Sequence, residues 1–301
     1  MAAAQAMLDT YHDPLQQDLH DDNNYTLGRI GRHNVVLACL PAGVMGTISA
    51  AKVATQMLSN FRGLRFGLMV GIGGGVPSEE NDIRLGDVVV SKPTGTFGGV
   101  IQYDFGKTVQ EGRFTRTGSL NRPPDVLLAA MSNLQAKNLR EGHNFSKYLS
   151  EMVMKYPNMS PQFTHPALER DLLYEAEYDH PKGNTTCSRC ESRRLINREP
   201  RKSTAPAVHY GLIASGDQLM KHGATRDQLR REIDVLCFEM EAAGLMDNFP
   251  CLVIRGICDY ADSHKNKCWQ AYAAATAAAY AKELLCLIPG KNVIRTQTAG
   301  E

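Results

Sequence analysis

The sequence predicts a single α/β domain with a mostly parallel central sheet and helices on both of its faces. Short apolar, β-branched runs alternate with segments of helical periodicity along most of the chain. The apolar runs are continuous, which is typical of strands buried on both faces. A length of 301 residues suits one large domain or two small ones. We expect the domain to span 1–290, with a tail over 291–301.

The first half of the chain predicts three strands and three helices. Residues 1–10 are strong helix formers, and Pro123 and Pro124 open another helix. A glycine run, 71–75, predicts a sharp turn. In order, the expected elements are a helix over 1–10, a strand over 34–40, a helix over 47–61, strands over 65–71 and 84–92, and a helix over 123–140.

An irregular insertion interrupts this pattern at about 141–206, where Gly, Asn, Pro, His and charged residues are mixed. Regular alternation then returns and continues almost to the end of the chain. The expected elements are strands over 208–215, 234–239 and 250–258 and helices over 224–232, 241–248 and 268–288.

Composition excludes several classes of protein. Lys and Arg number 33 and Asp and Glu 32, so a broad basic surface for nucleic acid is not expected. No window reaches the roughly 18 apolar residues of a membrane span, and the N-terminus lacks a signal sequence. Most of the eight cysteines lie in apolar runs, as free thiols do. We therefore expect a cytoplasmic protein with neither a membrane nor a nucleic acid as partner.

The glycine run Gly71-Ile72-Gly73-Gly74-Gly75 follows a predicted strand, where its N–H groups could face an oxyanion or a small ligand. It is not a dinucleotide fingerprint, because the last glycine of that motif would fall on Val76 and no long helix begins there. The Lys-Ser/Thr pair of a phosphate-binding P-loop is also missing. A tight turn without function remains the alternative.

Two acidic clusters follow neighbouring predicted strands. Phe238-Glu239-Met240-Glu241 ends one strand, and Asp259 ends the next. In open α/β sheets, ligands bind outside the carboxyl ends of strands, so both clusters would face one crevice. The alternative is that these carboxylates only interact with helix N-termini.

Together these motifs resemble the nucleoside phosphorylase and nucleosidase family, which includes purine nucleoside phosphorylases, uridine phosphorylases and methylthioadenosine/S-adenosylhomocysteine nucleosidases. The resemblance covers about 25–288 and looks most like the fungal branch. The residues that carry it are Gly71–Gly75, the Arg84–Val90 run, Ser215-Gly216-Asp217, Phe238–Glu241 and Cys258-Asp259.

The resemblance implies cleavage of the N-glycosidic bond of purine ribonucleosides. Asp259 matches the acid at the leaving base, Glu241 the carboxylate that holds the ribose hydroxyls, and Met240 the apolar residue under the sugar. Gly71, Ile72, Gly73, Gly74 and Gly75 match the segment that faces the nucleophile. The other implied substrate contacts are Glu239, Phe238, Cys258, Ser215, Asp217, Leu219 and Met220. Relatives usually form homo-oligomers, and no cofactor is implied.

Two departures bear on the reaction. Phosphorylases of the family hold phosphate with an Arg and a Ser, where this chain has Met69 and Ile72, so hydrolysis is favoured over phosphorolysis with phosphate as co-substrate. Arg84 or a neighbouring subunit could still supply the charge. Nucleosidases of the family orient water with a Glu that follows their first strand, and we expect that strand to be missing here. Glu79 or Glu80 could replace that Glu. A non-catalytic nucleoside sensor is the remaining alternative.

A Cys187-Ser188-Arg189-Cys190 motif lies in the insertion. Its spacing is that of half a zinc site, but a second half is missing, with only His180 and Glu191 nearby in sequence. We therefore expect a free or redox-sensitive cysteine pair and no metal.

Overall fold

The fold is described from a computed structural model of the chain, over residues 1–167, 170–183 and 186–300. Residues 168–169 and 184–185 of the predicted insertion, and residue 301 of the predicted tail, lie outside the described residues. In the part that is described, no helix has the length and apolar character needed to cross a membrane.

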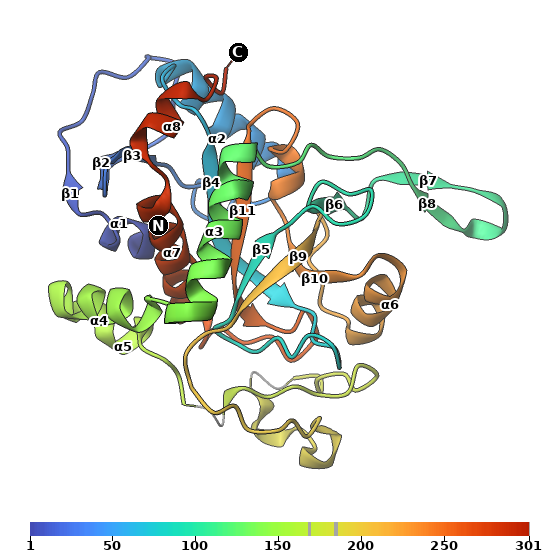
Figure 1. The fold of residues 1–301 in the computed structure, drawn as a ribbon. Coiled ribbons are helices and arrows are strands. Elements are labelled where there is room, and N and C mark those ends of the chain that lie inside the picture. Colours follow the sequence, from blue (N-terminus) through green and yellow to red (C-terminus); the bar gives the residue numbers. More distant parts are fainter. Residues whose placement is uncertain (168–169, 184–185, 301) are drawn as a thin grey trace.

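A six-stranded sheet forms the centre of the molecule (Figure 1). Its strands are β4 (Gly67–Gly75), β5 (Val88–Ser91), β6 (Val100–Gln102), β9 (Val208–Ser215), β10 (Val235–Glu239) and β11 (Cys251–Asp259). Their order is β10-β4-β11-β5-β9-β6, and β10 also pairs with β9. Within the described residues the sheet therefore closes into a ring of five strands, and β6 extends it beside β9.

The strands run in two directions. β4 and β11 are parallel to each other. β9 is parallel to each of β5, β6 and β10. The two groups meet antiparallel at β10–β4 and at β11–β5. The predicted α/β class is confirmed, but the sheet is mixed rather than mostly parallel. Apolar runs indicate that a strand is buried, but they do not indicate which strands become its neighbours. The relative direction of neighbouring strands could therefore not be predicted from them.

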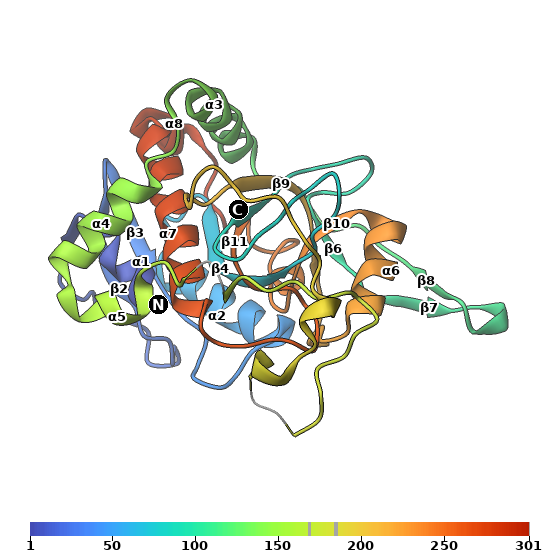
Figure 2. The same ribbon diagram turned by 90° about the horizontal axis from the view of Figure 1, so that it is seen from below.

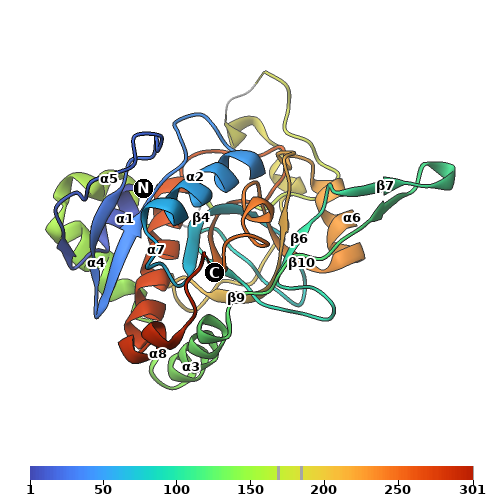
Figure 3. The same cartoon turned by 90° about the horizontal axis from the view of Figure 1, so that it is seen from above.

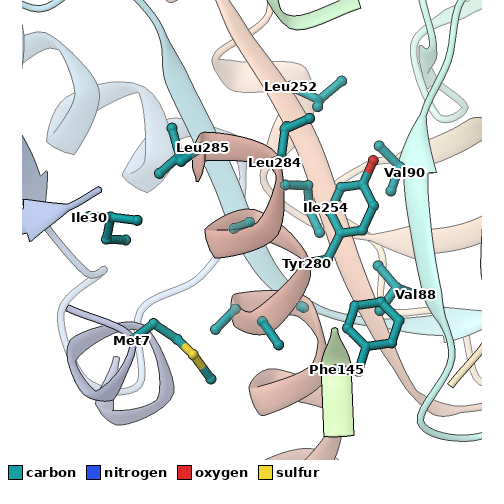
Figure 4. Close-up of a cluster of buried hydrophobic side chains, with 14 of the residues drawn as sticks. Met7, Ile30, Val88, Val90, Phe145, Leu252, Ile254, Tyr280, Leu284 and Leu285 are labelled. Atoms are coloured by element: carbon teal, nitrogen blue, oxygen red, sulfur yellow. The ribbon is translucent and has the colours of Figure 1, made fainter. Parts of the chain in front are cut away.

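Helix α7 (Gln270–Leu287) covers one face of β4 and β11. Its Tyr280 and Leu284 pack among β-strand side chains in the core that Figure 4 shows. The helix is rich in alanine and lies very close to β11, so that an added Cβ on Gly256 would overlap with the carbonyl of Ala273. Four further described helices pack against α7: α1 (Ala2–Ala6), α3 (Asp125–Glu141), α4 (Phe145–Lys155) and α5 (Ser160–Phe163).

The opposite face is covered by α2 (Thr47–Asn60), which packs against the short 3₁₀ helix η6 (Ala242–Gly244) (Figure 3). Alternation along β11 shows the two faces. Leu252 and Ile254 belong to the α7 core, whereas Cys251 and Val253 belong to the second core with Ala50 of α2. Helix α6 (Gly223–Ile233) packs against β10. The predicted helices on both faces are therefore present.

Several predicted elements need correction. The strand expected at 34–40 is β3 (His33–Leu37), which lies in a separate antiparallel sheet with β1 (Thr10–Tyr11) and β2 (Thr26–Ile30) and is not fully buried. The helix expected over 1–10 ends early because the chain turns into β1. The helix expected at 241–248 is only the single turn η6. The strand expected at 84–92 begins at Val88, after a turn closed by Asp87.

The region 141–206 is only partly irregular. It begins with helix α4, whose Phe145 and Met152 are buried against α7, and continues with α5 (Ser160–Phe163). The helical spacing of these apolar residues was present in the sequence but was obscured by the polar residues around it. The 3₁₀ turns there are η2 (Pro157–Met159), η4 (Cys187–Arg189) and η5 (Ser192–Arg194).

A hairpin of β7 (Gly106–Thr108) and β8 (Phe114–Arg116), joined by the 3₁₀ turn η1 (Gln110–Gly112), projects away from the body of the fold (Figures 1 and 2). At the other end of the chain, the predicted tail contains helix α8 (Gly290–Arg295).

Candidate active site

The carboxyl ends of β4, β10 and β11 converge at one point. Gly74 of β4 pairs with Phe238 of β10 on one side and with Asp259 of β11 on the other. β10 runs opposite to β4 and β11, yet its carboxyl end reaches theirs because β10 and β4 overlap only through their last residues, as at the Cys237–Gly75 pair. The two acidic clusters are therefore together, as predicted, although the strands that carry them are not all parallel.

The glycine run is not a turn. Its residues form the second half of strand β4, and at each of its four glycines another group occupies the space that a side chain would need. At Gly71 that group is the guanidinium of Arg255, and at Gly73 it is the thiol of Cys237. An added Cβ on Gly74 would lie 2.8 Å from both Ala261 Cβ and Asp259 Oδ1. The prediction of a sharp turn is wrong because glycine here permits close approach rather than an unusual backbone angle.

A buried ion cluster joins β10 to β11. Arg255 is only 4% exposed, and its Nη2 donates to Glu239 and lies 3.4 Å from Oε2 of Glu241. Glu239 also accepts the N–H of Ala242 at 3.0 Å, so it fixes the start of η6. Breaking a buried pair of this kind typically costs about 3–5 kcal/mol, because the remaining charge is left without a partner.

Glu241 is the accessible member of this cluster. Its side chain is half-buried, whereas Glu239 is almost fully buried. Burial raises the pKa of Glu241 above its ordinary value, although the charge of Arg255 opposes the shift. A carboxylate held in this way keeps oxygens available to a hydroxyl donor.

Asp259 lies beside a cation. Lys265 Nζ is 2.9 Å from Asp259 Oδ2, and the N–H of Ala261 donates to Oδ1 at 3.0 Å. The neighbouring thiol of Cys258 lies 3.2 Å from Oδ2, and its pKa is raised well above the ordinary value by burial and by the carboxylate. Ala261 adopts a φ of 53°, which costs energy for a residue with a side chain. The chain thus bends sharply to hold this carboxylate at the strand end.

The residues expected beside the base are only partly in this group. Ser215 is buried and accepts the N–H of Ala243 at 2.9 Å, so it holds η6 against β9. Asp217 accepts hydrogen bonds from the N–H and the hydroxyl of Thr47, at 2.9 and 3.0 Å, at the start of α2. Leu219 is 46% exposed, whereas Met220 packs against the core beside β10.

The positions that depart from the phosphorylase pattern are accounted for by packing. Met69 and Ile72 are half-buried and contact the hydrophobic core on the α2 side. Glu79 and Glu80 are exposed in the turn after β4. Arg84 is paired with Asp82 at 2.8 Å, and its Nη2 donates to the carbonyl of Glu199.

Sequence reasoning missed three contributors to this site. Arg255 was a detectable signal, because a charged residue inside an apolar strand requires a buried partner. Lys265 gave no signal, since it follows Asp259 by six residues in a polar segment. Tyr103 gave no signal either. Its ring meets that of Phe238 edge to face, with 5.4 Å between the ring centres, and its hydroxyl donates to the carbonyl of Gln218.

A separate cavity of about 510 Å³ lies between the insertion and the turn before β5. Its walls include Arg84, Asp171, Arg198, Arg201 and Trp269; the residues expected to contact the nucleoside are not among those that line it in the described part of the chain.

The domain has carboxylates at the ends of β10 and β11, beside the glycine-rich end of β4, and its sequence matches that of known proteins. The family model described as "Phosphorylase superfamily" matches residues 4–287. The chain therefore belongs to the phosphorylase superfamily. The family expected from the sequence is confirmed.

Three relatives illustrate the match. A nucleotide-binding leucine-rich repeat (NLR)-like protein of Hyaloscypha variabilis is 50% identical over 96% of this chain, and the chain spans only 28% of that protein's length. A 5'-methylthioadenosine/S-adenosylhomocysteine nucleosidase of Mycobacterium bovis is 25% identical over 87% of this chain and 84% of its own. The Neisseria meningitidis nucleosidase of the same name, solved with methylthio-immucillin-A, shares the fold with a TM-score of 0.58 and 16% identity, over 95% of each chain.

Proposed function

We propose that this domain hydrolyses the N-glycosidic bond of purine ribonucleosides and releases the free base. The observation that carries the proposal is the juxtaposition of Asp259 and Glu241 at the converging ends of β11 and β10. One carboxyl group can donate a proton to the base, while the other accepts hydrogen bonds from the sugar. The nucleosidase relatives support this reaction class, as does the membership in the superfamily.

Asp259 acts at the leaving base. When the bond between the sugar C1' and the base breaks, negative charge develops on the purine, and a proton from Asp259 makes the base neutral. The Asp259 carboxylate that remains is stabilised by Lys265, 2.9 Å away, and regains its proton from solvent. Water forms the new bond to C1'. One of its protons stays on the new sugar hydroxyl, and the other is released to solvent.

Glu241 binds the sugar. Its two oxygens can accept hydrogen bonds from the vicinal 2'- and 3'-hydroxyls, and its position is held by Arg255. Met240 provides an apolar surface under the ribose, and Phe238 with Tyr103 provides an aromatic one toward the base. Ser215 acts indirectly, because it fixes the η6 turn that follows Glu241.

Water is favoured over phosphate as the nucleophile. A phosphate dianion needs a charged partner such as a bidentate arginine. Met69 and Ile72 are packed in the core instead, Arg84 is paired with Asp82, and Arg255 already faces two carboxylates. An anion at the glycine run would be desolvated against backbone N–H groups alone.

A non-catalytic nucleoside sensor is the second candidate. It is favoured by the ion pair of Asp259 with Lys265, because a carboxylate in an ion pair is less ready to act as an acid. The similarity to one part of a longer NLR-like protein also favours it. In this case a nucleoside would bind between Glu241 and Asp259 without turnover.

The deciding experiment incubates the protein with adenosine, inosine, guanosine, uridine and 5'-methylthioadenosine, with and without phosphate, and separates the products by chromatography. Free base and free sugar in the absence of phosphate are expected. Sugar 1-phosphate that forms only with phosphate would contradict hydrolysis and support phosphorolysis. Binding by calorimetry without any base release would support the sensor. A homo-oligomer and a cytoplasmic location stay predictions, tested by light scattering and by fractionation of cells.

A further inference from the structure

Two cysteines and a histidine gather in the insertion, far from the acidic cluster in sequence. Among the described residues, the ligand atoms of His180, Cys187 and Cys190 all lie within 4.8 Å of one another. The turn η4 starts at Cys187, and the N–H of Cys190 donates to the Cys187 carbonyl at 3.0 Å. This tight turn holds the two thiols together, and all the cysteines are free.

A fourth group adjoins this cluster from another part of the chain. His264 is only 6% exposed, and among the described residues neither of its ring nitrogens has a hydrogen-bond partner; Asp262 Oδ1 lies 3.9 Å from its Nδ1, beyond hydrogen-bond distance. Its ring meets that of His180 edge to face, with 5.4 Å between the ring centres, and is stacked on Tyr174 at 4.0 Å. A buried imidazole without partners is costly, and a ligand for its nitrogen would remove that cost.

The donor set determines which ligand fits. Thiolate sulfur and imidazole nitrogen favour zinc over the oxygen-seeking Mg²⁺ and Ca²⁺. At Zn–S of about 2.3 Å and Zn–N of about 2.0–2.1 Å, a tetrahedral site needs ligand atoms roughly 3.3–3.8 Å apart. His180, Cys187 and Cys190 need only a small contraction to reach that geometry, whereas the ring of His264 has to move toward them.

We propose that His180, Cys187 and Cys190 bind a zinc ion and that His264 completes a tetrahedral, structural site. Both thiols release their protons to solvent when the metal binds, and no redox change takes place. The two ligands that the sequence motif lacks are supplied by two histidines. His180 precedes the cysteines in the sequence, and His264 follows them.

The site would join the insertion to the loop that follows Asp259. The N–H of His180 donates to Ser263 Oγ at 2.9 Å, and that hydroxyl donates to Asp179 at 3.0 Å. The Cys187 thiol lies 3.9 Å from the carbonyl of His264. These contacts place the cluster next to the segment that carries Lys265, so a metal here would hold the loop in position.

The test measures zinc in the full chain, purified without chelator, by mass spectrometry of the metal. About one zinc per chain is expected in the parent, as for other four-ligand sites. The double variant Cys187→Ser/Cys190→Ser should lose at least nine-tenths of it, and His264→Ala should bind zinc more weakly. The matched control is Cys39→Ser/Cys286→Ser, which removes two exposed thiols outside the cluster and should keep the metal.

Cobalt titration of the parent provides a second measurement that does not depend on whether a variant folds. Thiolate-to-cobalt charge-transfer absorption, present in the parent and in the control variant, is expected. Equal zinc in the cysteine variant and the control would overturn the proposal. So would a parent that binds neither metal, or one whose Cys187 and Cys190 are joined in a disulfide, seen as a mass lower by two hydrogens.

Discussion

The guanidinium of Arg255 occupies the volume that a side chain at Gly71 would need. The two residues pair across β4 and β11, and Arg255 reaches over the bare backbone to meet the carboxylates at the end of β10. The absence of a side chain at position 71 is therefore part of how the buried ion cluster is held.

Gly71→Ala is expected to destabilise the protein and reduce base release. A methyl group there must displace Arg255, and overpacking of this kind typically costs about 1–3 kcal/mol. Urea denaturation followed by circular dichroism measures the change in the free energy of unfolding. The control is Gly63→Ala, where an added Cβ meets nothing within 4 Å and should change little. Equal stability of the two variants would mean that Arg255 can move away without cost.

Asp259→Asn is expected to abolish base release while nucleoside binding is retained. The amide cannot protonate the leaving base, and a general acid typically contributes about 10²- to 10⁴-fold to the rate. Single-turnover chromatography measures the rate, and calorimetry measures binding. A useful control is Asp125→Asn, since Asp125 is exposed at the start of α3 and pairs with Arg122. A rate within twofold of the parent would place the acid elsewhere.

Glu241→Ala is expected to weaken binding of ribonucleosides and to lower the rate, because the acceptor of the sugar hydroxyls is lost. A 2',3'-dideoxynucleoside should bind the parent and the variant equally. Comparing KM and kcat for both substrates measures this. If the variant still discriminates between the two substrates as the parent does, Glu241 does not contact the diol.

The raised pKa of Glu241 adds a dependence on pH. Burial favours the protonated form, which accepts hydrogen bonds less well, so KM for a ribonucleoside should rise as the pH falls through that raised pKa. In Glu241→Gln the KM should not follow pH in this way. The measurement is a series of KM values from neutral to acidic pH for both proteins.

Asp87→Asn is expected to cost about 1.5–3 kcal/mol of stability at neutral pH, because the buried Asp87 carboxylate accepts charge-assisted hydrogen bonds from Arg201 and His209 that an amide cannot replace. Burial alone would raise the pKa of Asp87, but hydrogen bonds from His209 at 3.0 Å and from Arg201 lower it overall. Because the pKa is lowered in the folded state, the ionised carboxylate stabilises the fold at pH values above about 3.9, the pKa of an Asp in the unfolded chain.

That contribution is lost as the pH falls below about 4 toward the folded pKa of Asp87. The difference between parent and Asp87→Asn in urea denaturation should therefore be largest at neutral pH and shrink at pH 3. A difference that stays constant across this range would show that the Asp87 charge does not contribute.

Local patterns in the sequence were sufficient for much of the framework. Continuous apolar runs predicted β9, β10 and β11 to within about two residues, and the Ala-rich run predicted α7. Asp259 and Glu241 were predicted together because polar residues at the ends of buried strands are visible in a single stretch of sequence. These features depend on residues that are neighbours along the chain.

Only the tertiary structure decided the features that depend on distant residues. Gly71 was predicted in a turn and lies in a strand, because the group that requires glycine there is Arg255, which comes much later in the chain. Asp217 contacts Thr47 at the start of α2, a contact that no local pattern indicated. His264 meets His180 of the insertion because the loop after β11 packs against the insertion. Close approach between distant segments leaves no periodic signal in the sequence, since it is set by which elements become neighbours in space.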